Sequence, residues 1–373
     1  MTATNFLSPR TDRGLVQSLR LAFGAVVGTL LAGCYVLQAA RGQATILVKR
    51  EPIERVIARA RTPAPVRTRL EQVIGIREFA SRELGLPRNR SYTTYSDVGR
   101  PFVVWNVFAA PEFSVEPKRW CFPIAGCVPY RGYFAQKSAR RFAERLRLQG
   151  FDVHVGGVAA YSTLGHFADP VLSTMIGLDD VQLAGIIFHE LAHQRVYAPD
   201  DSSFNEAFAT AVEEEGVRRW LLAAARSAEL DQFSERRRHL VAVNDELMRT
   251  RATLRGIYAR SVVTPANIAA MRAEKAQALA VPGARLLELS KEWNDGIDYS
   301  AWFGGGFNNA RLTAVATYFD CVPGFARLLA GAGGDLPAFY ATVTALAKRP
   351  AAERRAALCK TGSDSWRTTQ RTN

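Results

Sequence analysis

Hydrophobic and polar positions follow different periods in the two halves of the chain. Between residues 100 and 160, short stretches rich in valine and aromatic residues predict β-strands. The expected strands are 102–109, 113–121, 130–134 and 151–155. In the same half, apolar residues three or four positions apart predict helices at 53–60, 66–84 and 138–149.

After Asp180 the helical period dominates. The expected helices are about 181–197, 204–225, 229–260, 265–280, 284–294, 308–319 and 335–347. Strands first and helices later predict an α+β fold, with a small N-terminal mixed sheet followed by a mostly helical region. We expect a domain over 34–350, sheet-rich at about 100–160 and helical at about 180–350, before a polar tail at 361–373.

Composition is typical of a folded protein, with 48% hydrophobic and 22% charged residues, but the net charge is +13. This basicity suits anionic lipid or acidic partners. The arginines are scattered along helices such as 138–149 and 234–251, and no helix-turn-helix, zinc-finger or RNA-binding pattern accompanies them. We therefore expect no nucleic-acid partner.

The N-terminus is typical of a secretory signal. Three arginines lie in residues 1–20, an apolar stretch covers 21–31, and the small residues Ala32 and Gly33 precede Cys34. The Leu-Ala-Gly-Cys run resembles the lipobox of bacterial lipoproteins. The resemblance implies a signal peptide at 1–33, a lipid anchor on Cys34 and a periplasmic location, with Tyr35 favouring the outer membrane.

An uncleaved anchor over 21–40 is the alternative, because this stretch is just long enough to span a bilayer. Both readings place the domain outside the cytoplasm.

Four further cysteines then lie in an oxidising compartment, which favours disulfides. Three pairings are possible, and proximity favours Cys121 with Cys127 and Cys321 with Cys359.

The residues His189, Glu190 and His193 form a His-Glu-x-x-His pattern on a predicted helix. Histidines four positions apart project from one side of a helix, so both rings can reach one Zn²⁺. Glu190 is offset from the metal, where it can take a proton from a water molecule that zinc has acidified. We therefore assign Glu190 as general base.

A catalytic zinc needs a third protein ligand. Val196 and Pro199 exclude the metzincin extension, which requires glycine and histidine there. Glu206, in the first turn of the following helix, can turn back towards His189 and His193 and supply the ligand.

The HELAHQ and NEAFA stretches at 189–194 and 205–209 resemble the gluzincins, above all the M1-type aminopeptidases. The chain also resembles a bacterial lipoprotein family named "putative aminopeptidases", over most of 34–350. The matching blocks are 123–134, 156–169, 189–194, 204–210 and 308–318. The resemblance implies a thermolysin-like fold, one zinc ion on His189, His193 and Glu206, and a peptide substrate.

In this comparison Glu213 orients a histidine, or replaces Glu206 as a ligand in a minor alternative. The chain departs from the M1 pattern in two ways. Only 13 positions separate His193 from Glu206, and the upstream block lacks the glutamate that grips the substrate amine. Asp169 is our candidate for that amine, and Tyr318 and Tyr161 are candidates for stabilising the oxyanion.

A zinc aminopeptidase is therefore the leading hypothesis. The alternatives are a non-catalytic periplasmic lipoprotein that binds partners on a peptidase fold, a zinc endopeptidase, and an amidase that acts on cell-wall material. The oligomeric state does not follow from the sequence.

Overall fold

The computed structural model describes residues 35–122, 126–160, 162–260, 262–293, 306–319 and 321–359, without the side chains of 315–319. It begins with a helix that covers 35–48. The strands are β1 (Glu51–Pro52), β2 (Thr94–Ser96), β3 (Val104–Pro111), β4 (Trp120–Phe122), β5 (Gly126–Val128), β6 (Tyr130–Tyr133), β7 (Phe151–Val158) and β8 (Val171–Leu172).

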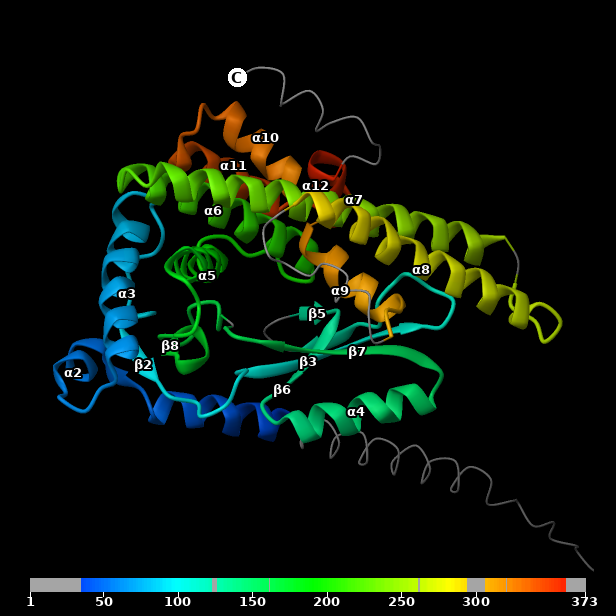
Figure 1. The fold of residues 1–373 in the computed structure, drawn as a ribbon, viewed down its shortest axis with the longest axis horizontal. Helices are drawn as coiled ribbons and strands as arrows, with labels where there is room; N and C mark the ends of the chain where they lie inside the picture. The colour runs from blue at the N-terminus through cyan, green and yellow to red at the C-terminus, as the bar shows by residue number, and fades with distance from the viewer. Residues whose placement is uncertain are drawn as a thin grey trace, which may run out of the picture.

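The helices follow a similar order along the chain. They are α2 (Ile53–Ala58), α3 (Ala64–Arg82), α4 (Gln136–Leu148), α5 (Asp180–His193), α6 (Ser202–Ala223), α7 (Ser227–Ala259), α8 (Ile268–Glu292), α9 (Asn309–Phe319), α10 (Val322–Gly331), α11 (Leu336–Ala347) and α12 (Ala351–Leu358). The sheet-bearing part thus precedes a mostly helical part, and the predicted α+β class is confirmed (Figure 1).

The main sheet has β3 at its centre, antiparallel to β6 on one side and to β7 on the other. Because side chains alternate along a strand, its two faces have different neighbours. Val107 and Ala109 face α4, whereas Phe108 and Ala110 face α9. Figure 1 shows α4 below the sheet and α9 above it, on the side where α5 and α6 lie.

The remaining strands form a second sheet and a hairpin, and they are too short to show a two-residue period in the sequence. A second sheet has the order β1-β2-β8, and β4 and β5 form a hairpin that pairs Cys121 with Cys127. The expected strand at 113–121 is wrong for most of its length, because β4 begins only at Trp120. Val115 instead packs in the small core beneath α7 and α8.

Helices α5 and α6 form the centre of the main core. Leu183, Ile187 and Leu191 on α5 are buried, together with Phe204 and Phe208 on α6. The two helices approach closely where α6 carries Gly216, since a Cβ there would lie 2.7 Å from a ring carbon of Phe188. This tight packing fixes the side chains of α5 relative to those of α6.

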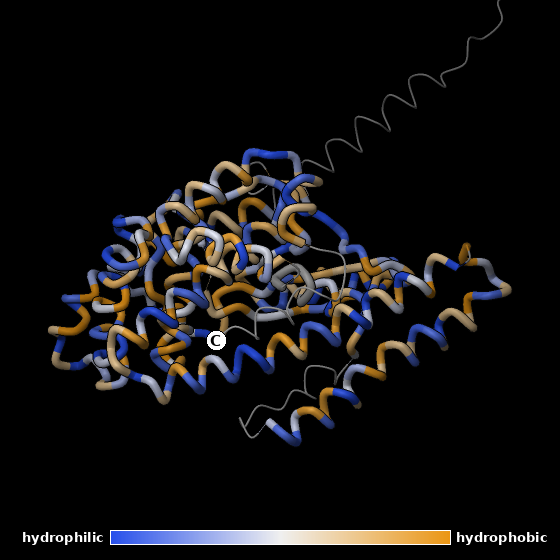
Figure 2. Tube along the Cα trace, turned by 90° about the horizontal axis from the view of Figure 1, so that it is seen from above, coloured by the Kyte–Doolittle hydropathy of each residue, from blue (hydrophilic) through white to orange (hydrophobic). Residues whose placement is uncertain are grey.

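The long helices α7 and α8 run side by side and extend beyond the body (Figures 1 and 2). They share a small core in which Val243 and Leu254 meet Ala278 and Leu286. The two helices expected at 265–280 and 284–294 are one continuous helix, α8. Pro282 lies buried inside it, so packing along α7 outweighs the usual helix-breaking effect of proline. No helix in the described ranges is both long and apolar enough to cross a membrane.

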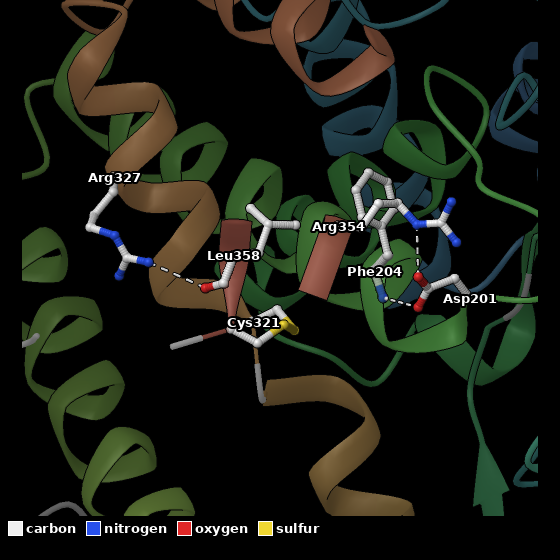
Figure 3. Close-up of a disulfide and its surroundings, with 7 residues drawn as sticks. Asp201, Phe204, Cys321, Arg327, Arg354 and Leu358 are labelled. Carbon is white, nitrogen blue, oxygen red and sulfur yellow. Dashed lines mark hydrogen bonds and ion pairs between the residues drawn. A yellow bond between two sulfur atoms is a disulfide. The ribbon is translucent and has the colours of Figure 1, made fainter. Parts of the chain in front are cut away.

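Both disulfides that proximity favoured are present, Cys121–Cys127 and Cys321–Cys359. The second joins the start of α10 to the residue after α12 (Figure 3). The loop it closes has a sequence separation of 38, against 6 for the first.

These loop lengths predict unequal stabilisation, because a crosslink removes more entropy from the unfolded chain when its loop is longer. Replacing Cys321 and Cys359 with serine should lower the free energy of unfolding by about 4 kcal/mol, and the same change at Cys121 and Cys127 by about 2 kcal/mol. Urea denaturation of the two double variants measures both values. Equal losses would contradict the assignment of the stabilisation to loop entropy.

Candidate metal centre

Helix α5 presents two histidines from its last turn. The helix begins with a capping box, in which the Asp179 side chain accepts a hydrogen bond from the Gln182 backbone and Gln182 returns one. Its apolar face is buried, which directs His189 and His193 towards α6 and the sheet. Their rings lie edge to face with centroids 4.9 Å apart, so their nitrogens can approach one point.

The connection from α5 to α6 is closed by Asn205. Its side-chain oxygen accepts a hydrogen bond from the Ala198 backbone N–H at 2.7 Å, and its amide donates to the Ala198 carbonyl at 2.8 Å. Asp201 caps α6 by accepting from the Phe204 N–H. These contacts fix the first turn of α6, which carries Glu206 back to the histidines.

The nitrogens of both histidines converge on one carboxylate oxygen. Glu206 Oε2 lies 3.3 Å from His189 Nε2 and 3.8 Å from His193 Nε2, and one ligand atom from each of the three residues lies within 4.8 Å of the others. Ligands at the corners of a tetrahedron around zinc lie about 3.3 Å apart when each bond is about 2.0 Å. His189, His193 and Glu206 could therefore bind a metal ion.

Glu213, on the same face of α6, fixes the orientation of His189. Its Oε2 lies 3.0 Å from His189 Nδ1, which leaves Nε2 directed at Glu206. Gly185 leaves space for this carboxylate, since a Cβ at that position would lie 3.2 Å from Glu213 Oε1. Glu213 thus touches the far nitrogen of His189 rather than the point where His189, His193 and Glu206 meet.

The electrostatics of this cluster suit a cation. Burial alone would lower the pKa of His189, but hydrogen bonds with Glu206 and Glu213 raise it well above its usual value. Burial lowers the pKa of His193 to about 4, so this ring is neutral at pH 7 and one of its two nitrogens carries a free lone pair. Burial would raise the pKa of Glu206, but the two histidines outweigh it and hold that pKa below its usual value.

Neither ring nitrogen of the buried His193 has a close partner among the described residues. His193 is 8% exposed, and its Nδ1 has no hydrogen-bond partner among the described residues. The other ring nitrogen, Nε2, lies 3.8 Å from Glu206 Oε2, which is too far for a hydrogen bond. A metal ion on Nε2 would account for burying this ring.

Glu190 lies between the two histidines in sequence, outside the set of three ligands. Burial raises the pKa of its carboxyl to about 8, the charges of Glu206 and Asp169 add to the rise, and His189 opposes it. A carboxyl group whose pKa lies near neutrality can both accept and return a proton at physiological pH.

The other expected site residues have different surroundings. Asp169 is 4% exposed, and its carboxylate accepts hydrogen bonds from the backbone and hydroxyl of Thr163 at 2.9 and 2.8 Å. It therefore closes the loop between β7 and β8. Tyr161 and Cys34 lie outside the described residues, and Tyr318 lies in α9 with its side chain outside them.

Tyr130 is a site residue that sequence reasoning missed. It lies on β6, in register with Phe108 of β3, and its ring packs on the face of the sheet that α9 covers. Burial raises the pKa of its hydroxyl, and the charges of Glu206 and Glu190 raise it further. Its place inside the family-like block 123–134 was the available signal.

The α5–α6 connection is also held from outside. The β4–β5 hairpin contacts it through the Cys127 N–H, which donates to Asp200 Oδ1, and through Arg119, which donates to the Asp200 carbonyl. From the other side, Arg354 of α12 donates to Asp201 at 2.8 Å and lies over the ring of Phe204 (Figure 3). Both disulfide-linked parts of the chain therefore contact the segment between His193 and Glu206.

Comparison with protein families shows that a family model described as "Putative aminopeptidase" matches residues 34–358. The chain therefore belongs to this family, whose name suggests peptidase activity. No curated protein and no solved structure matches the chain.

The contact between Glu213 and His189 generates a prediction about metal affinity. Exchanging Glu213 for glutamine should weaken metal binding about 10–100-fold. The reason is that the Glu213 carboxylate both orients the His189 ring and makes it more basic. Competition with a chelating dye measures the dissociation constant. Glu215→Gln is the matched control, since Glu215 pairs with Arg218 and Arg219 instead. Equal affinities for both variants would remove Glu213 from the site.

Proposed function

We propose that this member of the aminopeptidase family is a zinc-dependent peptidase of gluzincin type, and more specifically an aminopeptidase. The observation that carries the proposal is the convergence of His189, His193 and Glu206 within 4.8 Å, beside Glu190. Two histidines and a carboxylate are the ligand set of catalytic zinc in thermolysin-like enzymes, in which a fourth position stays open. The HELAHQ and NEAFA stretches resemble the M1-type pattern in the same residues.

Bound zinc would supply Lewis acidity, which acidifies a water molecule and polarises the substrate carbonyl. The chain's own residues do the rest. Glu190 accepts the proton of the attacking water through its carboxylate and passes it to the leaving amine nitrogen. Glu213 holds His189 in the orientation that the metal needs.

Tyr130 is the residue we propose as hydrogen-bond donor to the oxyanion. Its hydroxyl makes no hydrogen bond among the described residues, and the charges of Glu206 and Glu190 reach it. Burial raises the pKa of this hydroxyl and the two negative charges raise it further, so it stays protonated at neutral pH, as a donor requires. Tyr318 and Tyr161 remain candidates for the same role.

Removal of one residue from an unblocked N-terminus would require a group that binds the substrate amine. The Asp169 carboxylate is occupied by Thr163, so we do not base the exopeptidase proposal on it. Its basis is the family name. We further propose that the protein lies on the periplasmic side of the cell envelope, attached through a lipid on Cys34.

The test of this function combines metal analysis with a substrate panel. We expect one zinc per chain and release of fluorophores from unblocked amino-acyl substrates. Glu190→Gln should keep the zinc and lower kcat by about 10²–10⁴-fold, because it removes the base without touching a ligand. His189→Ala is the complementary variant and should lose the zinc.

The outcomes separate the alternatives. Cleavage of blocked or internal peptides would make the protein an endopeptidase, and release from peptidoglycan fragments alone would make it an amidase. Zinc without turnover would support a binding protein, and the absence of zinc would refute the metal site.

The role of Tyr130 gives a further prediction. Tyr130→Phe should lower kcat about 10²–10³-fold, as expected for loss of one oxyanion donor, while zinc content and KM stay nearly unchanged. Steady-state kinetics and elemental analysis measure these values. Tyr197→Phe is the control, since Tyr197 also lies near Glu206 but is not the proposed donor. A full-rate Tyr130→Phe enzyme would show that another group stabilises the oxyanion.

A further inference from the structure

The outward face of α4 carries mostly positive charge. Its exposed cations are Lys137, Arg140, Arg141, Arg145 and Arg147. Glu144 is the single carboxylate among them, and it pairs with Arg147 at 3.2 Å. Among the described residues, Lys137, Arg140 and Arg141 have no carboxylate partner, although side-chain carboxylates are the usual neighbours of surface arginines.

The outward cations of α4 do not pack against the rest of the described chain. The opposite side of α4 is buried on the sheet through Ala139, Ala143 and Leu146. The outward side carries a shallow depression lined by Gln136, Lys137, Arg140, Arg141 and Glu144. At the end of the helix Leu148 is 81% exposed, so an apolar residue lies beside the cations.

The N-terminal segment begins beside this helix. Tyr35 is the first described residue, and it directly follows Cys34. Its ring lies 3.9 Å from the guanidinium of Arg131, and that guanidinium lies 4.8 Å from the ring of Phe142 on α4. Tyr35 also stacks on Phe122 of β4. Through these contacts the residue next to Cys34 is fixed against the same edge of the molecule as α4 (Figure 1).

We propose that the outward face of α4 lies on the surface of an anionic phospholipid bilayer and sets the orientation of the domain on the membrane. The inference rests on the proposed attachment through Cys34. Because Tyr35 packs on the domain, no flexible linker separates the attachment point from it. Charge complementarity selects the partner: phosphate headgroups attract cations that lack carboxylates, and Leu148 can enter the headgroup region.

The contact should be electrostatic and therefore sensitive to salt. Each Lys or Arg near an anionic bilayer contributes roughly a fivefold gain in association, and the attraction decays over about 10 Å at 0.1 M salt. An acidic protein could in principle bind the same cations, but nothing about the position of Tyr35 would favour it. We therefore commit to the bilayer, and the experiment separates the two.

The experiment uses the chain that begins at lipidated Cys34, reconstituted in vesicles. Lys137 is labelled with a water-soluble amine-reactive reagent, and Lys348 at the end of α11 serves as an internal reference on a different part of the molecule. With about 30% phosphatidylglycerol, the labelling of Lys137 relative to Lys348 should fall at least about fivefold compared with neutral vesicles. About 1 M salt should restore it.

Charge reversal supplies the matched variants. The double variant Arg140→Glu with Arg141→Glu should abolish the protection of Lys137. The pair Lys348→Glu with Arg355→Glu makes the same change in net charge at exposed positions outside α4 and should leave the protection intact, with the exposed Lys291 of α8 as the reference lysine. Circular dichroism confirms that each variant is folded.

Each result has one meaning for the proposal. Equal labelling of Lys137 in neutral and anionic vesicles would overturn it, including the case in which an acidic protein is the true partner. Flotation with neutral vesicles reports the attachment through Cys34 separately, so a chain that floats without protecting Lys137 would keep the attachment and lose the α4 contact. Protection that salt does not reverse would also overturn it.

Discussion

The constraint on which the rest of the site depends is the short connection between α5 and α6. His193 ends one helix and Glu206 lies in the first turns of the next, so the chain must reverse within 194–201 for both to reach one point. The paired hydrogen bonds between Asn205 and Ala198 close this reversal, and Asp200 takes a left-handed conformation to allow it. Any loosening here would move a ligand, because helices α5 and α6 are otherwise rigidly packed.

The local chemistry of this site could be predicted from sequence because it is periodic. Residues four apart on a helix share a face, and a glutamate at the start of the following helix is the natural third ligand. The short strands β1, β2 and β8 carry no such period, and they were not predicted. Tyr130 was missed for a related reason: it reaches the site through cross-strand register with Phe108, which a single sequence does not reveal. The helices expected at 265–280 and 284–294 are one helix, because α8 continues through the buried Pro282.

The main sheet separates two surfaces with different roles in the proposed arrangement. Phe108 and Tyr130 point to the side of α9 and the metal centre, whereas Val107 and Ala109 point to α4. If α4 rests on a bilayer, the site lies on the opposite side of the sheet from the membrane. Alternation along β3 thus allows one strand to support both the chemistry and the attachment surface.

The contact between Arg354 and Asp201 joins residues 153 positions apart. Asp201 caps the helix that carries Glu206, so part of the support of the candidate metal site comes from α12, the last described helix. During synthesis, α5 and α6 emerge long before α12. The cap therefore gains its buried arginine only after α12 has been made, and Cys321 can pair with Cys359 only after that point. A chain interrupted before α12 would carry His189, His193 and Glu206 but would lack the ion pair that holds the connection between them.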